Sequence, residues 1–117
     1  MGAYKQVIVM RKDLTMRKGK VVAQGGHGCV RAALKSQHTK ETQTWLKEGE
    51  TKICVTVNSE DELLSIYSQA VMKNLTCSLV TDAGHTEFHG EPTLTCCVIG
   101  PGDCEEIDKI TGGLPLW

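Results

Sequence analysis

The sequence predicts an α/β fold: a single compact domain in which a mixed four-stranded sheet is sandwiched between helices. Four short apolar runs rich in β-branched residues are typical of buried strands. Segments with apolar residues at helical spacing lie between most of these runs, which is the pattern of an α/β protein. The length of 117 residues suits one hydrophobic core, so we expect one domain over residues 1–117.

The first half of the chain is predicted to form a strand, two helices and a second strand. The run QVIVM at 6–10 predicts a buried strand. After a polar connection we expect a helix from about Lys18 to about Gln37, and then a short helix at 41–47. The run ICVTV at 53–57 predicts the second strand.

The second half is predicted to form a helix, two strands and a last short helix. The helix is expected after the capping residues at 58–59, because acidic residues and then apolar residues at helical spacing follow them. The runs CSLVT at 77–81 and TCCVI at 95–99 predict strands joined only by a polar loop, so the sheet should be mixed. The sequence GPG at 100–102 is expected to break the chain before the last helix.

The composition is that of an ordinary globular protein, with 40% apolar and 23% charged residues. No apolar run approaches the roughly 18–20 residues that span a bilayer, and the N-terminus lacks the apolar segment of a secretory signal. We therefore expect a cytoplasmic protein without a membrane partner. The six cysteines include no C-x-x-C pair, which argues against a zinc knuckle and favours reduced, buried thiols.

The charge is unevenly distributed although the net charge is only −1, which argues against a general nucleic-acid coat. Five basic residues gather within ten positions near the N-terminus, whereas the acidic residues lie elsewhere. A patch of this kind can hold a few phosphates, but it is equally compatible with a solvated loop. The five basic residues are Arg11, Lys12, Arg17, Lys18 and Lys20.

The stretch RKGKVVAQGGHGCVRAAL at 17–34 fits neither common nucleotide-binding motif. No Lys-Ser or Lys-Thr follows its glycines, as a Walker loop requires, and Arg31 takes the place of the third glycine in a dinucleotide fingerprint. As a helix, the stretch has a polar face that consists of Lys20, Gln24, His27 and Arg31. Its small apolar face consists of Val22, Gly26, Cys29 and Ala33. We expect the glycines to permit close approach to the sheet or to a ligand. The polar face alone is also typical of an ordinary amphipathic helix.

Four separated motifs add a resemblance that spans nearly the whole chain. In order, they are KGKVVAQGGH, TDAGHTEF, CCVIGPG and EIDKITGGLPL. Together they resemble the archaeal and eukaryotic class of peptidyl-tRNA hydrolase, the Pth2 family. The resemblance implies hydrolysis of the ester between a peptide and the 3′ ribose of tRNA, which recycles tRNA from abandoned translation. It also implies peptidyl-tRNA as the partner, a homodimer as a frequent assembly, and neither a metal nor an organic cofactor.

The resemblance also implies the site residues. The implied catalytic residues are Lys20, His27, Asp82, Thr86 and Thr95, with Thr93 as the alternative to Thr95. The implied substrate-binding residues are Gln24, Arg31, His85 and the basic residues Arg11, Lys12, Arg17 and Lys18. His85 stands where relatives commonly have arginine, so a titratable group replaces a permanent charge at an expected tRNA contact.

Ester hydrolysis needs an activated water and stabilisation of the developing oxyanion. His27 is the candidate base, because histidine is the side chain whose ordinary pKa lies nearest neutrality. Lys20 is expected to stabilise the oxyanion or hold a phosphate, and Asp82 to orient Lys20 or the water. Thr86 and Thr95 are expected to hydrogen-bond around the water.

A Cys29 nucleophile is disfavoured, because Cys29 lies two positions from His27 and points to a different side of the helix. Two other functions stay open: a non-catalytic RNA-binding or adaptor module on the same fold, and a hydrolase of another small substrate.

Overall fold

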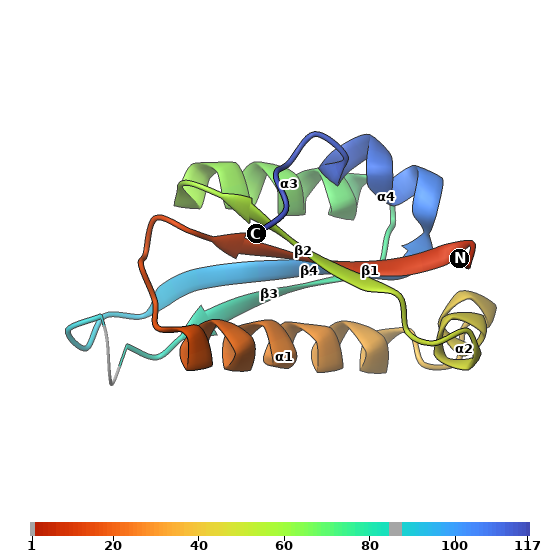
Figure 1. Cartoon of the computed structure of the whole chain (residues 1–117), viewed down its shortest axis with the longest axis horizontal. Coiled ribbons are helices and arrows are strands. Elements are labelled where there is room, and N and C mark those ends of the chain that lie inside the picture. Colours follow the sequence, from red (N-terminus) through yellow and green to blue (C-terminus); the bar gives the residue numbers. More distant parts are fainter. Residues whose placement is uncertain (1, 85–87) are drawn as a thin grey trace.

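The computed structural model describes residues 2–84 and 88–117, and within them strands and helices follow one another in the predicted order (Figure 1). The elements are β1 (Tyr4–Arg11), α1 (Lys18–Lys35), α2 (Lys40–Lys47), β2 (Lys52–Val57), α3 (Glu60–Met72), β3 (Cys77–Asp82), β4 (Thr93–Asp103) and α4 (Cys104–Thr111). Among the described residues, no helix is both long and apolar enough to cross a membrane.

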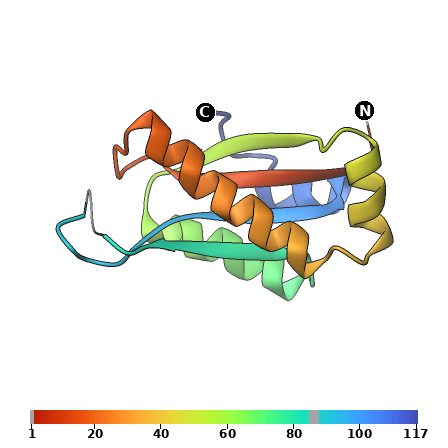
Figure 2. The same cartoon turned by 90° about the horizontal axis from the view of Figure 1, so that it is seen from below.

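The four strands form one mixed sheet in the order β2-β1-β4-β3. β1 and β2 are parallel, whereas β4 runs antiparallel to both β1 and β3. Helices α1 and α2 lie on one face of the sheet, and α3 and α4 lie on the other (Figures 1 and 2). The predicted α/β fold with a mixed sheet between helices is therefore confirmed.

Strand β1 shows how the sheet separates two apolar clusters, because alternate side chains of a strand point to opposite faces. Val7 and Val9 are fully buried in the cluster that includes residues of α3 and α4. Met10 belongs to the cluster on the other face, and Ile8 packs against that cluster. The candidate active site lies on this second face.

The predicted break at 100–102 is wrong, because β4 continues through these residues and pairs with the start of β1. The pairing register shifts between Lys5 and Val7, as at a β-bulge, and this shift accommodates the irregular segment. Gly100 has φ of +96°, and a Cβ atom at this position would lie 2.4 Å from the carbonyl oxygen of Lys5. Glycine therefore lets the strand bend here without ending.

Helix α1 packs on β4 and β3 through a different side from the predicted one. Its buried residues are Gln24, Gly25, Gly28 and Ala32. Val22 and Gly26 belong to the small apolar face that was expected to approach the sheet or a ligand, but Val22 is 74% exposed and the space around Gly26 is open. The reason is that α1 turns the amide of Gln24 inward to hydrogen-bonding partners on the sheet.

The predicted close approach to the sheet occurs at Gly28. A Cβ atom on Gly28 would lie 2.5 Å from Cγ2 of Val98 in β4, so a side chain cannot fit without movement. The hydroxyl of Ser78 in β3 donates a hydrogen bond of 2.8 Å to the carbonyl oxygen of Gly28. Both contacts require α1 to lie close to the sheet.

The C-terminal segment runs along the open edge of β2. Leu116 forms an antiparallel bridge with Val55, and the backbone N–H of Trp117 donates to the carbonyl oxygen of Cys54 at 3.1 Å.

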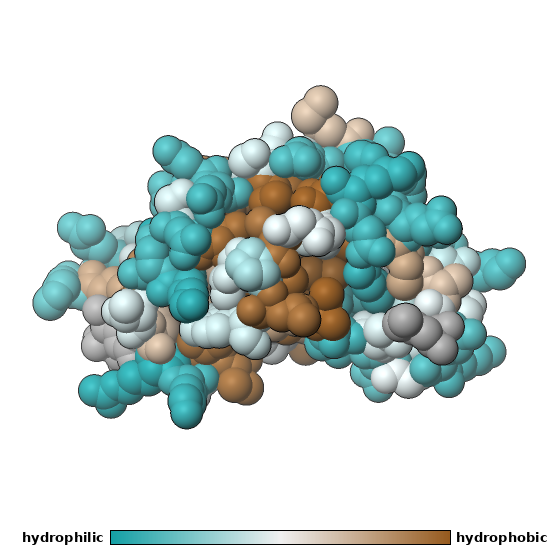
Figure 3. Space-filling view, turned by 45° about the horizontal axis from the view of Figure 1, so that its top comes forward, coloured by the Kyte–Doolittle hydropathy of each residue, from teal (hydrophilic) through white to brown (hydrophobic). Residues whose placement is uncertain are grey.

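Figure 3 shows hydrophobic residues gathered at the centre of one face of the molecule, between hydrophilic areas. Val22 and Leu116 are among the most exposed apolar side chains, at 74% and 72%.

Candidate active site

The candidate active site lies where the first turns of α1 cross the end of β3 and the beginning of β4. Because β3 and β4 are antiparallel neighbours, the last residue of β3 lies beside the first residues of β4. Asp82 is that last residue, and Thr95 lies near the start of β4. Lys20 and Gln24 are four positions apart in α1 and so point the same way.

These four residues form one continuous polar network. The ammonium nitrogen of Lys20 lies 3.2 Å from Oδ1 of Asp82, and Nε2 of Gln24 donates to the same oxygen at 3.4 Å. The hydroxyl of Thr95 donates to Oε1 of Gln24 at 2.6 Å. The backbone N–H of Gly84 donates to the second oxygen of Asp82 at 2.8 Å. The contacts to the two ends of the Gln24 amide fix its orientation.

The network runs from the core toward the surface. Thr95 is fully buried and Gln24 is 6% exposed, whereas the side chains of Lys20 and Asp82 are 13% and 15% exposed. An ion pair this sheltered from water is stronger than an exposed one. The N-terminus of α1 adds partial positive charge nearby. A substrate could therefore contact the charged end of the network, while the buried amide and hydroxyl hold that end in place.

His27 and Arg31 extend the same side of α1 beyond Gln24. Both side chains are exposed, and neither forms a hydrogen bond or ion pair with another residue in the described part of the chain. The imidazole of His27 is thus accessible, but the structure does not join it to the Lys20–Asp82 pair.

Of the two candidate threonines of β4, Thr95 contacts the network. The hydroxyl of Thr93 instead donates to the backbone carbonyl of Glu91 at 3.0 Å. Two further predicted residues, His85 and Thr86, lie outside the described residues.

The basic patch divides into two sheltered residues, Arg11 and Lys20, and three exposed residues. Nη2 of Arg11 lies 2.7 Å from a carboxylate oxygen of Asp13, and Nη1 donates to the carbonyl of Leu94 at 3.0 Å. This hydrogen bonding holds the pKa of Asp13 below its ordinary value. Lys12, Arg17 and Lys18 are exposed around the start of α1. Arg11 therefore has a structural task that the sequence did not reveal.

Two residues beside the network were not identified from the sequence. The ammonium of Lys20 lies 5.0 Å from the ring centroid of Phe88. The thiol of Cys96 donates to the backbone carbonyl of Gln24 at 3.5 Å, and burial raises the pKa of this thiol to about 12. Cys96 is therefore a neutral thiol that supports α1. One feature of the sequence could have indicated a role for Phe88: it is the only phenylalanine of the chain, and it lies in a polar loop.

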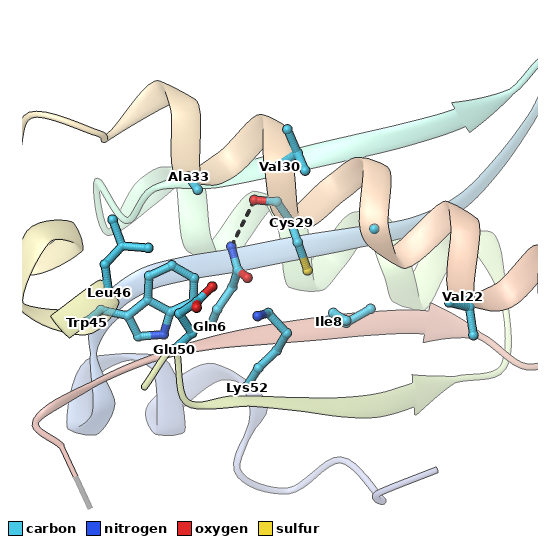
Figure 4. Close-up of a pocket in the computed structure, with 11 residues that line it drawn as sticks. Gln6, Ile8, Val22, Cys29, Val30, Ala33, Trp45, Leu46, Glu50 and Lys52 are labelled. Atoms are coloured by element: carbon cyan, nitrogen blue, oxygen red, sulfur yellow. Dashed lines mark hydrogen bonds between the residues drawn. The ribbon is translucent and has the colours of Figure 1, made fainter. Parts of the chain in front are cut away.

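Cys29 lies away from the network, on the flank of α1 that faces β1 and β2. There it lines a pocket of about 430 Å³ together with Trp45 and Lys52 (Figure 4). Gln6, also in this pocket, donates from Nε2 to the carbonyl oxygen of Cys29 at 3.2 Å. Burial raises the pKa of the Cys29 thiol, which makes it a poor nucleophile. Within residues 2–84 and 88–117, no three His, Cys, Asp or Glu side chains are grouped so that they could hold a metal ion.

The fold and the network together define an α/β protein with a partly buried lysine–aspartate–glutamine–threonine cluster at one end of its sheet. The chain belongs to the peptidyl-tRNA hydrolase PTH2 family, whose sequence model matches residues 4–117. This family is the one that the four sequence motifs indicated.

Curated relatives match over almost their whole lengths. A peptidyl-tRNA hydrolase of Methanocaldococcus jannaschii is 51% identical over 115 residues, which are 96% of this chain and 98% of that protein. One of Methanothermobacter thermautotrophicus is 46% identical over 112 residues, with the same coverage of both chains. One of Thermococcus onnurineus is 42% identical over 118 residues and 99% of each chain.

A solved structure shares the fold. It is a protein of unknown function from Agrobacterium, with a TM-score of 0.70 at 13% identity, covering 100% of this chain and 99% of that one. At this identity the likeness concerns the fold alone.

Proposed function

We propose that this protein hydrolyses the ester bond between the peptide and the 3′ ribose of peptidyl-tRNA, in the cytoplasm where translation releases such molecules. Membership of the PTH2 family and near-complete coverage of relatives named peptidyl-tRNA hydrolase support the proposal. The observation that carries it is the Lys20–Asp82 pair, held at the edge of the core by Gln24 and Thr95. This arrangement presents a fixed positive charge to a bound ester.

In the proposed reaction, His27 accepts a proton from a water whose oxygen attacks the ester carbonyl carbon. The Lys20 ammonium stabilises the negative charge that develops on the carbonyl oxygen. Asp82 keeps Lys20 in position, while Gln24 holds Asp82 from the other side. The bond to the ribose oxygen then breaks, and that oxygen takes up a proton as the tRNA leaves.

Contacts to the tRNA are assigned to the surface around this site. Lys12, Arg17 and Lys18 are proposed to meet tRNA phosphates, because all three are exposed beside the start of α1. Arg31 is proposed to contact the substrate further along the helix. His85 is proposed to contact the tRNA, and Thr86 is proposed to contact the attacking water. Both proposals rest on the motif TDAGHTEF.

Release of tRNA from a purified peptidyl-tRNA tests the proposed activity. We expect the wild-type protein to release it, and Lys20→Ala and Asp82→Asn each to lower the rate by about a hundredfold. Lys20→Ala removes the charge that stabilises the oxyanion, and Asp82→Asn removes the carboxylate that holds this charge in place. Lys52→Ala, which removes an exposed lysine on the other flank of α1, should leave the rate unchanged. Wild-type turnover in folded Lys20→Ala and Asp82→Asn proteins would refute the site assignment.

The same experiment separates the two other functions that the sequence leaves open. Binding of peptidyl-tRNA without release would favour the RNA-binding or adaptor module. Neither binding nor release would favour a different small substrate. With active protein, affinity for tRNA should fall as salt rises, because phosphate contacts release counterions. A flat response to salt would count against the proposed contacts of Lys12, Arg17 and Lys18.

We also propose that the chain forms a homodimer through exposed apolar side chains that include Leu116, which lies at the edge of β2 and is 72% exposed. Figure 3 shows that hydrophobic residues gather on one face of the molecule. Contiguous exposed apolar surface on a small protein is typical of an interaction site. Light scattering after size-exclusion chromatography should give a dimeric mass for the wild type and a smaller mass for Leu116→Glu. A monomeric wild-type protein at micromolar concentration would refute the dimer.

A further inference from the structure

Phe88 is anchored in the apolar cluster beneath the candidate site. Its side chain is partly buried and packs against the cluster that contains Met10, Met16, Val80 and Cys96. The backbone carbonyl of Phe88 accepts a hydrogen bond of 2.9 Å from the N–H of Glu91. The core therefore restrains the ring by packing, and the loop that leads into β4 restrains the backbone of Phe88 by this hydrogen bond.

The anchored ring lies beside the charged end of the network. The Lys20 ammonium is 5.0 Å from its centroid and 3.2 Å from Oδ1 of Asp82. A lysine side chain has four flexible carbon–carbon bonds, and an ion pair alone leaves it much freedom. The face of an aromatic ring attracts an ammonium group within about 6 Å, so the ring adds a further restraint from the loop that leads into β4.

The chain contains a second lysine–aromatic pair with the same spacing. Lys52 lies 5.0 Å from the ring of Trp45 on the other flank of α1, and this lysine forms no ion pair within the described residues. The two pairs differ in their surroundings: the Lys52 pair stands at an open pocket, whereas Lys20 is only 13% exposed and also contacts a carboxylate. The Trp45–Lys52 pair is therefore a matched control within the same molecule.

We propose that Phe88 is a positioning residue for ester hydrolysis: its ring holds the Lys20 ammonium where the oxyanion of the ester develops. This role rests on the proposed function. It predicts that the aromatic face of residue 88 matters for the rate, and not only its apolar bulk.

The test compares Phe88→Leu, which keeps apolar bulk, with Phe88→Trp, which keeps an aromatic face. In single-turnover hydrolysis of peptidyl-tRNA, the leucine variant should be between about twofold and thirtyfold slower at saturating enzyme, with little change in apparent affinity. The tryptophan variant should stay within about twofold of the wild type. Trp45→Leu should lower thermal stability without slowing hydrolysis. If the leucine variant does not fold, Phe88→Met serves as the second variant that lacks a ring.

A double-variant experiment shows whether the ring acts through Lys20. In a Lys20→Met background, Phe88→Leu should cause no further loss of rate, because the partner of the ring is already absent. An equal loss with and without Lys20, or equal rates for the leucine and tryptophan variants, would overturn this role while the proposed activity stands. A wild-type protein that releases no tRNA would instead overturn the proposed function, and the role of Phe88 with it.

Discussion

Thr95 illustrates how one buried hydroxyl of the network can orient the groups at its charged end. It lies in the core, yet its hydrogen bond of 2.6 Å determines which end of the Gln24 amide faces Asp82. The sequence left Thr93 and Thr95 as alternatives, since both are threonines at the start of one strand. In a regular strand Thr93 and Thr95, two positions apart, would point to the same face. The register with β3 shifts between Val80 and Thr81, so Thr95 lies at a β-bulge, and its hydroxyl reaches Gln24 in α1.

Removal of that hydroxyl should affect both stability and rate. Thr95→Val leaves Oε1 of Gln24 buried without this donor, which should cost about 1–3 kcal/mol in the free energy of unfolding. It also frees the amide to turn away from Asp82, so hydrolysis should slow. Thr95→Ser retains a hydroxyl and should recover most of the rate. Urea denaturation and the release assay measure the two effects, and equal behaviour of the valine and serine variants would contradict this account.

Helix α1 combines, within one element, positions that must be glycine and positions that need not be. The sequence correctly predicted a helix through QGGHG despite its three glycines. It predicted the wrong packing side, because a run of small residues has no strong apolar face. Packing on β4 selects the side with Gly25 and Gly28, and it leaves Gly26 in open space.

Two substitutions in α1 should therefore act in opposite directions. Gly28→Ala places a Cβ atom 2.5 Å from Val98, and overpacking of this kind costs about 1–3 kcal/mol. Gly26→Ala meets nothing within 4 Å and should stabilise the helix by up to about 1 kcal/mol. Thermal denaturation of both variants measures the difference. If both alanines lower the melting temperature equally, close packing at Gly28 is not the reason for its glycine.

At the scale of the whole molecule, the burial of the cysteines links the stability of the fold to pH. All six are free, and Cys77, Cys96 and Cys97 are buried. Burial raises the pKa of each of these three thiols, to about 12 for Cys96. The folded protein therefore keeps protons that the unfolded chain loses first as the pH rises.

This linkage predicts that stability falls in mildly alkaline solution. Below pH 9 the thiols are mostly protonated in both the folded and the unfolded state, so their contribution to the free energy of unfolding is nearly constant. Above that pH the unfolded chain ionises while Cys96 does not, and each such thiol removes about 1.4 kcal/mol per pH unit. Urea denaturation between pH 8 and pH 10.5 should show this slope, and Cys96→Ala should make it shallower. Identical slopes in both proteins would contradict the prediction.

Much of the fold follows from local sequence. Runs of β-branched residues, capping residues and helical spacing place each element within a few residues of its observed bounds, as for the helix predicted to end near Gln37 and observed to end at Lys35. The predicted break at 100–102 was wrong, because glycine and proline are typical of turns but here lie in a paired strand. Only the neighbouring backbone of β1 shows that these residues can pair.

By itself, the sequence determined the order of strands and helices, the mixed character of the sheet and the membership of the PTH2 family. Tertiary structure alone decided that Lys20, Gln24, Asp82 and Thr95 form one network and that Phe88 lies against it. The physical reason is the range of the forces involved. Periodicity and capping act over a few residues. These contacts instead join positions about 60 to 70 residues apart in the sequence, and they depend on how α1 packs on the sheet.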